Sequence, residues 1–238
     1  MNRLFSLHYR RTLAFWASAA AAWLLAADAR AAVLITPSPE APTNHVFLSI
    51  ASGGTGNSAL NGLATGTASA VRELGQTFLV PGTTPIALQA FTLQLTTAVQ
   101  SGSPGAGMTV SIFKVTDATA LPTGAPAYTT SGNLPDLMTL GHYLTFEFDT
   151  AVMLEAGEYY AIQIGFTSLA ANQSFNVVTG NDYAGGRAFY YANSPNPAVM
   201  NYIGQSTDLK MVLQTIPEPG AVLLLGIGLG LFLLWRRK

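Results

Sequence analysis

Tyr159-Tyr160-Ala161-Ile162-Gln163-Ile164-Gly165-Phe166 is the stretch that decides the fold. Four of its large side chains, Tyr160, Ile162, Ile164 and Phe166, alternate with Tyr159, Ala161, Gln163 and Gly165. Successive side chains on a strand point to opposite faces, so this period of two predicts a strand with one buried face. A helix would need apolar residues every three to four positions.

The same alternation recurs along the chain, and turn signals separate the repeats. It predicts strands around Phe91, Leu93 and Leu95, around Leu144, Phe146 and Phe148, and around Leu209, Met211 and Leu213, with further strands at Met108–Thr116, His45–Ile50, Gln76–Val80, Phe175–Thr179 and Ala188–Tyr191. The turn signals are Pro81-Gly82, Ser103-Pro104-Gly105, Pro122-Thr123-Gly124 and Ala156-Gly157. About nine short strands without a long helical period favour an all-β fold, an antiparallel, jelly-roll-like β-sandwich over residues 44–216. The predicted core comprises Phe91, Leu93, Leu95, Phe146, Phe148, Ile162, Ile164 and Phe166.

Two segments of the body lack this pattern. Residues 32–43 are rich in proline and are predicted to be an extended lead-in. Residues 52–69 are rich in Gly, Ser, Thr and Ala and are predicted to be a long flexible loop.

Composition excludes several classes of function for residues 32–216. They carry four basic and ten acidic residues, a net charge of −6, so nucleic acid is not an expected partner. The chain has no cysteine, which excludes thiol catalysis, zinc–thiolate sites and iron–sulfur clusters. Neither His45 nor His142 stands in a recognisable catalytic motif, and no cofactor is expected.

The first 31 residues have the features of a secretory signal peptide. Arg3, Arg10 and Arg11 precede an apolar stretch, Leu13–Ala27, that forms the predicted signal helix. Ala29-Arg30-Ala31 is a small-x-small cleavage site before Ala32, and Ala27-Asp28-Ala29 is a second candidate. An uncleaved N-terminal anchor is the alternative.

The last 22 residues predict a membrane segment. Pro217-Glu218-Pro219 precedes the uncharged run Gly220–Trp235, and the basic cluster Arg236-Arg237-Lys238 follows. A helix of 16 residues spans about 24 Å, slightly less than a bilayer core of about 30 Å. The basic cluster favours the cytoplasmic side, which places the body outside the inner membrane, in the periplasm.

Pro217, Glu218 and Pro219, followed by an apolar helix and the basic stop Arg236, Arg237 and Lys238, resemble the PEP-CTERM sorting signal. This resemblance implies recognition and processing by an exosortase, in bacteria that also make extracellular polysaccharide. An ordinary C-terminal anchor with a chance Pro-Glu-Pro is the alternative.

The body is similar to the choice-of-anchor domains that precede sorting tails, most like the R type. The similarity rests on Leu74–Phe78, Leu88–Leu95, Val110–Phe113, Glu155–Ala161 and Gly185–Phe189 in this order. It implies a β-sandwich and a surface location, and it implies no catalytic chemistry.

Three groups of side chains in the body are candidate sites. Tyr183, Tyr190, Tyr191 and Tyr202 cluster late in the chain, where exposed rings would stack on sugars; core or loop packing is the alternative. Glu147 and Asp149, two apart on one strand, have a spacing used by glycoside hydrolases, but a solvated strand face explains them as well. Asp117, Asp182 and Asp208 are the residues considered for calcium, but no D-x-D-x-D-G loop is present and no metal is expected.

These observations predict a non-enzymatic surface or matrix protein associated with exopolysaccharide. Its partners would be an exosortase, the membrane and extracellular polysaccharide. A carbohydrate-binding module is the alternative, and a polysaccharide hydrolase a remote one.

Overall fold

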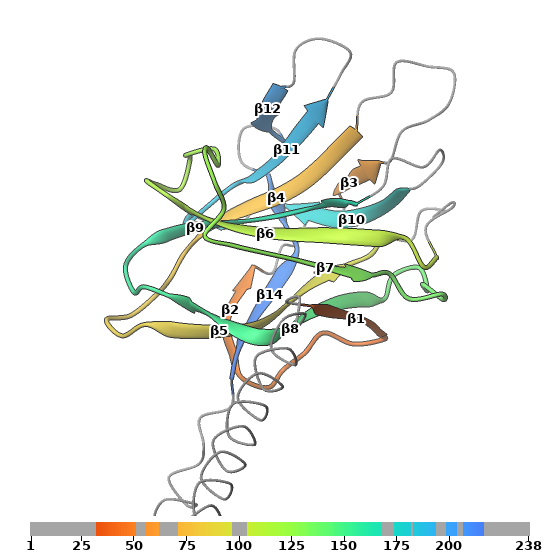
Figure 1. Cartoon of the computed structure of the whole chain (residues 1–238), viewed down its shortest axis with the longest axis horizontal. Coiled ribbons are helices and arrows are strands. Elements are labelled where there is room, and N and C mark those ends of the chain that lie inside the picture. The colour runs from red at the N-terminus through yellow and green to blue at the C-terminus, as the bar shows by residue number, and fades with distance from the viewer. Residues whose placement is uncertain are drawn as a thin grey trace, which may run out of the picture.

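The computed structural model describes residues 32–50, 56–61, 71–96, 104–167, 174–181, 183–193, 199–203 and 207–216. Within these residues the chain is all-β (Figure 1). No helix in these ranges is long and apolar enough to cross a bilayer. The predicted signal peptide 1–31 and the predicted tail 217–238 lie outside them.

The described strands form two antiparallel sheets, which we call sheet A and sheet B. The strands are β1 (Val33–Ser38), β2 (Val46–Ile50), β3 (Gly56–Asn61), β4 (Val71–Leu79), β5 (Ile86–Gln94), β6 (Gly107–Val115), β7 (Tyr128–Asn133), β8 (Tyr143–Leu154), β9 (Tyr159–Phe166), β10 (Ser174–Gly180), β11 (Ala188–Asn193), β12 (Val199–Tyr202), β13 (Asp208–Leu209) and β14 (Met211–Thr215). Sheet B has the order β1-β8-β5-β14-β2. Sheet A has the order β13-β10-β3-β4-β9-β6-β7, and the β11–β12 hairpin joins it through β4.

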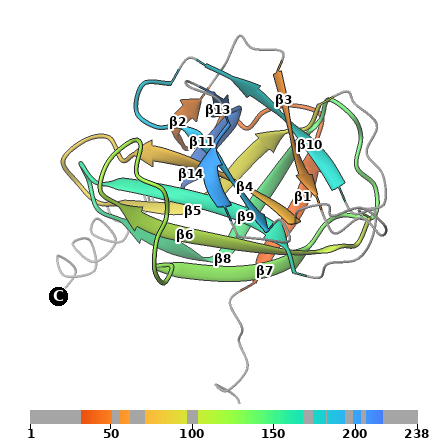
Figure 2. The same cartoon turned by 90° about the horizontal axis from the view of Figure 1, so that it is seen from above.

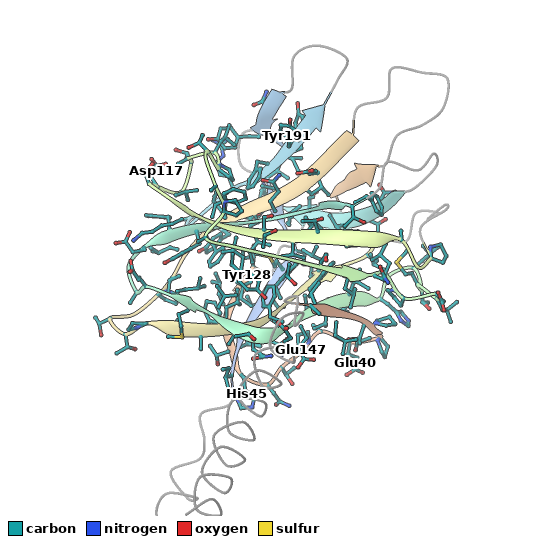
Figure 3. All side chains as sticks on the ribbon, in the orientation of Figure 1. Glu40, His45, Asp117, Tyr128, Glu147 and Tyr191 are labelled. Carbon is teal, nitrogen blue, oxygen red and sulfur yellow. The ribbon has the colours of Figure 1, made fainter. Side chains whose placement is uncertain are left out.

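The two sheets form two layers with the apolar core between them (Figure 1). Phe91 of β5 and Phe146 of β8 stack with ring centroids 4.5 Å apart. Tyr128 of β7, in sheet A, meets Phe148 of sheet B edge to face at 5.5 Å. Figure 3 places Tyr128 between the layers.

The predicted core is confirmed, because all eight of its side chains are buried. The predicted turns are also confirmed: Gly82, Gly105, Gly124 and Gly157 each have a positive φ, the conformation that favours glycine. The alternation over Tyr159–Phe166 therefore has the expected orientation, with Tyr160, Ile162, Ile164 and Phe166 facing the core.

The expected number of about nine strands is wrong, since the described residues form fourteen. One added strand, β3, lies inside the stretch 52–69 that was predicted to be a loop, so that prediction is wrong for residues 56–61. Strand β10 pairs with all six residues of β3 through the backbone. This pairing overrides the composition of β3, which is poor in residues that favour strands. Figure 2 shows β3 and β10 side by side, at the edge of sheet A away from β7. The rest of 52–69 lies outside the described residues.

Another added strand, β1, occupies half of the lead-in 32–43. It pairs with β8 from Val33↔Phe148 to Ser38↔Tyr143 and forms the edge of sheet B. Val33 and Ile35 are buried while Leu34 is exposed, so this segment is a half-buried edge strand that tolerates Pro37.

Cleavage before Ala32 is expected to leave β1 complete. The carbonyl of Ala32 accepts a hydrogen bond from the Asp149 N–H at 3.1 Å, and Ala32 bridges Ser131 of β7. Intact-mass analysis of the exported protein should give an N-terminus at Ala32 or within a few residues of it. A mature protein that retains Met1 would contradict this expectation.

Candidate functional site

The four tyrosines singled out by sequence divide between the two faces of sheet A. Tyr183 and Tyr190 are partly buried against the main core. The Tyr183 hydroxyl also accepts a hydrogen bond from the Leu79 N–H at 3.0 Å. Tyr191 and Tyr202 lie on the opposite, outer face, where Tyr191 pairs with Glu73 and Tyr202 with Phe189. Only Tyr191 and Tyr202, therefore, are placed to meet a ligand on the outer face.

A second, smaller apolar cluster supports this outer face. Phe189 is fully buried there, together with Val115 and Ala161. Its ring lies over Gly75 of β4, in the space that a Cβ at Gly75 would occupy. Tyr202 is partly buried against this cluster, which supports the Tyr202 side chain on the side that faces the sheet.

The connection 116–127 between β6 and β7 covers part of the outer face. Leu121 packs on the second cluster, and the Ala118 carbonyl accepts a hydrogen bond from Thr77 Oγ1 at 2.5 Å. Thr77 Oγ1 in turn accepts from the Arg187 N–H at 2.7 Å. The Arg187 guanidinium carbon lies 4.4 Å from the centroid of the Tyr202 ring, within the range of a cation–π contact. Tyr202 is thus held between a buried cluster and a cation.

Beside Tyr191 lies a polar pair that the sequence alone did not single out. Glu73 of β4 accepts a short hydrogen bond from the Gln163 side-chain amide of β9. A Cβ on Gly165 would lie 2.8 Å from Cγ of Glu73, so the glycine makes room for this carboxylate. Burial raises the pKa of the Glu73 carboxyl group, and the hydrogen bond from Gln163 opposes that rise. We call Glu73, Gln163, Arg187, Tyr191 and Tyr202 the tyrosine face.

Glu73→Gln is expected to raise the free energy of unfolding at pH 7. With its native pKa raised, the Glu73 carboxyl group stabilises the fold only when protonated, below pH about 4. That stabilisation is lost as the pH rises through the native pKa, and a neutral amide avoids the loss. Urea unfolding should show a gain for Glu73→Gln at pH 7 that shrinks towards zero below pH about 4. The exposed Glu147→Gln is the matched control, and a gain of equal size at both pH values would contradict the expectation.

A buried polar network lies behind the tyrosine face, between the sheets. Gln76 is fully buried; its amide nitrogen donates to Asp208 Oδ1 at 2.9 Å, and its Oε1 accepts from the Leu209 N–H at 2.8 Å. Asp208 Oδ2 accepts from the Tyr183 N–H at 3.1 Å. Asp208, considered for calcium, thus joins β4 to β13 and to the segment before β11.

The other candidate residues lie apart from this network. Asp117 caps its own turn, accepting from Thr119 N–H at 2.8 Å and Oγ1 at 2.7 Å, while Asp182 lies outside the described residues. Hydrogen bonding from Thr119 lowers the pKa of Asp117. Over the described ranges, no three His, Asp or Glu side chains gather to hold a metal ion. Glu147 and Asp149 are both exposed, on the sheet opposite the tyrosine face.

The chain approaches its predicted sorting signal along β14, an internal strand of sheet B between β5 and β2. Ile216, the last described residue, is exposed and adjoins Pro217. The signal residues Pro217, Glu218 and Pro219 and the stop Arg236, Arg237 and Lys238 lie outside the described residues. Figure 3 shows Tyr191 and Asp117 at the top of the molecule and His45, at the end of β14, at the bottom.

Comparison with protein families identifies a PEP-CTERM protein-sorting motif over residues 215–238. The motif implies an exported protein that is targeted to an exosortase, with a membrane-anchored precursor. It covers the tail and not the body. A comparison with curated proteins finds no match.

Proposed function

We propose that this chain is a non-catalytic protein of the cell surface or extracellular matrix, sorted by an exosortase and associated with exopolysaccharide. The PEP-CTERM motif at residues 215–238 is the observation that carries the proposal. The precursor is anchored in the inner membrane by Gly220–Trp235, with the body in the periplasm, and the processed protein reaches the surface. The two antiparallel layers support a jelly-roll-like sandwich of the choice-of-anchor type for the body.

The non-catalytic role is supported by the solvent exposure and the positions of the candidate carboxyl groups. A glycoside hydrolase needs one carboxyl group with a raised pKa beside an ionised one. Glu147 and Asp149 are both exposed to solvent, and Glu73, a carboxyl group whose pKa is raised by burial, lies on the other sheet.

The proposal is tested by following the protein in hosts with and without an exosortase. Intact-mass analysis and fractionation should show a shortened protein at the surface or in the medium of the first host. The second host should hold a longer precursor in its inner membrane. Identical mass and location in both hosts would refute exosortase sorting.

A second candidate function, binding to polysaccharide, rests on Tyr191 and Tyr202. These rings lie beside Glu73, Gln163 and Arg187, a combination of apolar faces and polar groups that suits a sugar ring. In a pull-down with exopolysaccharide, Tyr191→Ala and Tyr202→Ala should each weaken retention several-fold. Tyr143→Ala on β8, another half-buried tyrosine, is the control and should bind as the wild type does. Equal retention of all three variants would exclude the tyrosine face as the binding surface.

A further inference from the structure

The residues directly before Pro217-Glu218-Pro219 are fixed to the fold. The Thr215 N–H donates to the His45 carbonyl at 2.9 Å, and the Ile216 N–H donates to the Ala87 carbonyl at 3.2 Å. On the β2 side, next to His45, the Gln214 side-chain amide also donates to the Asn44 carbonyl at 3.1 Å. Both neighbours of β14 therefore hold the chain up to the residue before Pro217.

The stretch between Ile216 and the apolar run is too short to be a free spacer. Pro217, Glu218 and Pro219 separate Ile216 from Gly220, and two of the three are prolines. In an extended polyproline conformation the step from 216 to 220 covers about 12 Å, and fully extended at most about 14 Å. The headgroup region on one side of a bilayer is itself about 5–8 Å thick. With the apolar run inserted, the end of β14 stands within about 10 Å of the lipid surface.

The surface at this end of sheet B carries an apolar row. Ile216 is 42% exposed and Met153 of β8 is 64% exposed. Ala87 of β5 lies between them, pairing with Met153 and accepting the hydrogen bond from Ile216. Adjacent strands are about 4.8 Å apart, so the row is roughly 10 Å wide. We call Ile216, Ala87 and Met153 the apolar row.

The acidic residues in the turn beside the apolar row are partly neutralised by one lysine. In the turn after Met153, Glu155 and Glu158 both face Lys114, with N···O distances of 2.5 and 3.6 Å. Met153 pairs with Ala87 and exposed Glu147 pairs with Ala90, because the register of β5 and β8 shifts between them, so the two residues lie about 10 Å apart along the sheet. A contact through this end of sheet B places Glu147 about 10 Å from the row, just beyond a headgroup layer of about 5–8 Å.

We propose that, in the anchored precursor, the body rests on the outer surface of the inner membrane through the apolar row, which enters the headgroup boundary. This inference depends on the proposed function, because it requires Gly220–Trp235 to be inserted. The short tether makes the contact intramolecular, so even a weak contact with lipid is populated. The tyrosine face lies on the other sheet, apart from this contact.

Lipid quenching on the full-length precursor tests this contact. The chain has no cysteine, so Met153→Cys and Thr123→Cys each create one labelling site. Thr123 lies exposed in the connection over sheet A and is the matched control. The labelled precursors, from a host without exosortase, are reconstituted in phosphatidylcholine vesicles with spin-labelled headgroups. The label at 153 should be quenched several-fold more strongly than the label at 123. Equal quenching in precursors that float with the vesicles would overturn the contact and leave exosortase sorting standing.

A longer tether provides the second variant. Ten Gly/Ser residues inserted between Ile216 and Pro217 add a flexible span of about 17 Å. The inserted precursor should still float with the vesicles, while quenching at 153 should fall towards the value at 123. Unchanged quenching would overturn the argument from tether length. A precursor that does not float with vesicles at all would instead refute the membrane-anchored precursor, and this inference with it.

Discussion

A chain in which Pro217, Glu218 and Pro219 are all alanine is expected to stay in the inner membrane at full length, with processing essentially abolished. The bilayer responds to the apolar run Gly220–Trp235 and the basic cluster behind it, which this variant keeps. The exosortase responds to the motif, which the variant lacks. Size and location, compared with the wild type in an exosortase-positive host, measure the effect.

Two controls separate retention from recognition. Deletion of residues 221–238 removes the membrane segment and should release the body into the periplasm. Replacing Arg236, Arg237 and Lys238 with neutral residues keeps the motif. This change should weaken retention of the helix in the membrane and its preference for a cytoplasmic C-terminus. If the triple-alanine chain is processed as the wild type is, the tail is only an anchor and sorting by the motif is wrong.

Phe146→Ala is expected to lower the free energy of unfolding by about 3–5 kcal/mol, a large share of the 5–15 kcal/mol typical of a domain. The ring is fully buried and stacks on Phe91 at 4.5 Å with an angle of 4° between their planes. Its loss leaves a cavity between the layers and also removes the stacking contact. Urea unfolding followed by circular dichroism measures the change.

The neighbouring residue supplies the control for this variant. Glu147 is exposed on the same strand, so Glu147→Ala should change stability by no more than about 0.5 kcal/mol. A loss below about 0.5 kcal/mol for Phe146→Ala would show that the ring is not part of a packed core.

Where apolar and polar residues alternate, sequence was enough to predict the strands and the faces that they bury. The core side chains of β5, β8 and β9 face inward as their period requires. Strand β3 has no such period, being built from Gly, Asn, Ser, Ala and Leu, and it forms because β10 supplies the backbone partners. That pairing joins residues more than a hundred positions apart, which local patterns do not encode.

The tyrosine face was predictable only in part. Phe189-Tyr190-Tyr191 are all aromatic, so no polar residue marks which of them faces inward. The structure assigns Phe189 to a second cluster on the outer face because Gly75, on another strand, leaves space for its ring. The pairing of β4 with β9 and β11 brings the polar residues Glu73, Gln163 and Arg187 next to Tyr191 and Tyr202. These strands are far apart in the sequence, so local patterns do not reveal the arrangement.

The place of β14 also determines how the molecule bears mechanical load. Tension on the tail enters at Ile216 and runs along β14, which pairs with β5 on one side and β2 on the other. Force parallel to a strand shears both ladders at once, so many hydrogen bonds share it, whereas a strand pulled sideways from an edge loses them one by one. A pull on the tail is therefore expected to load the ladders of β14 with β5 and β2 together.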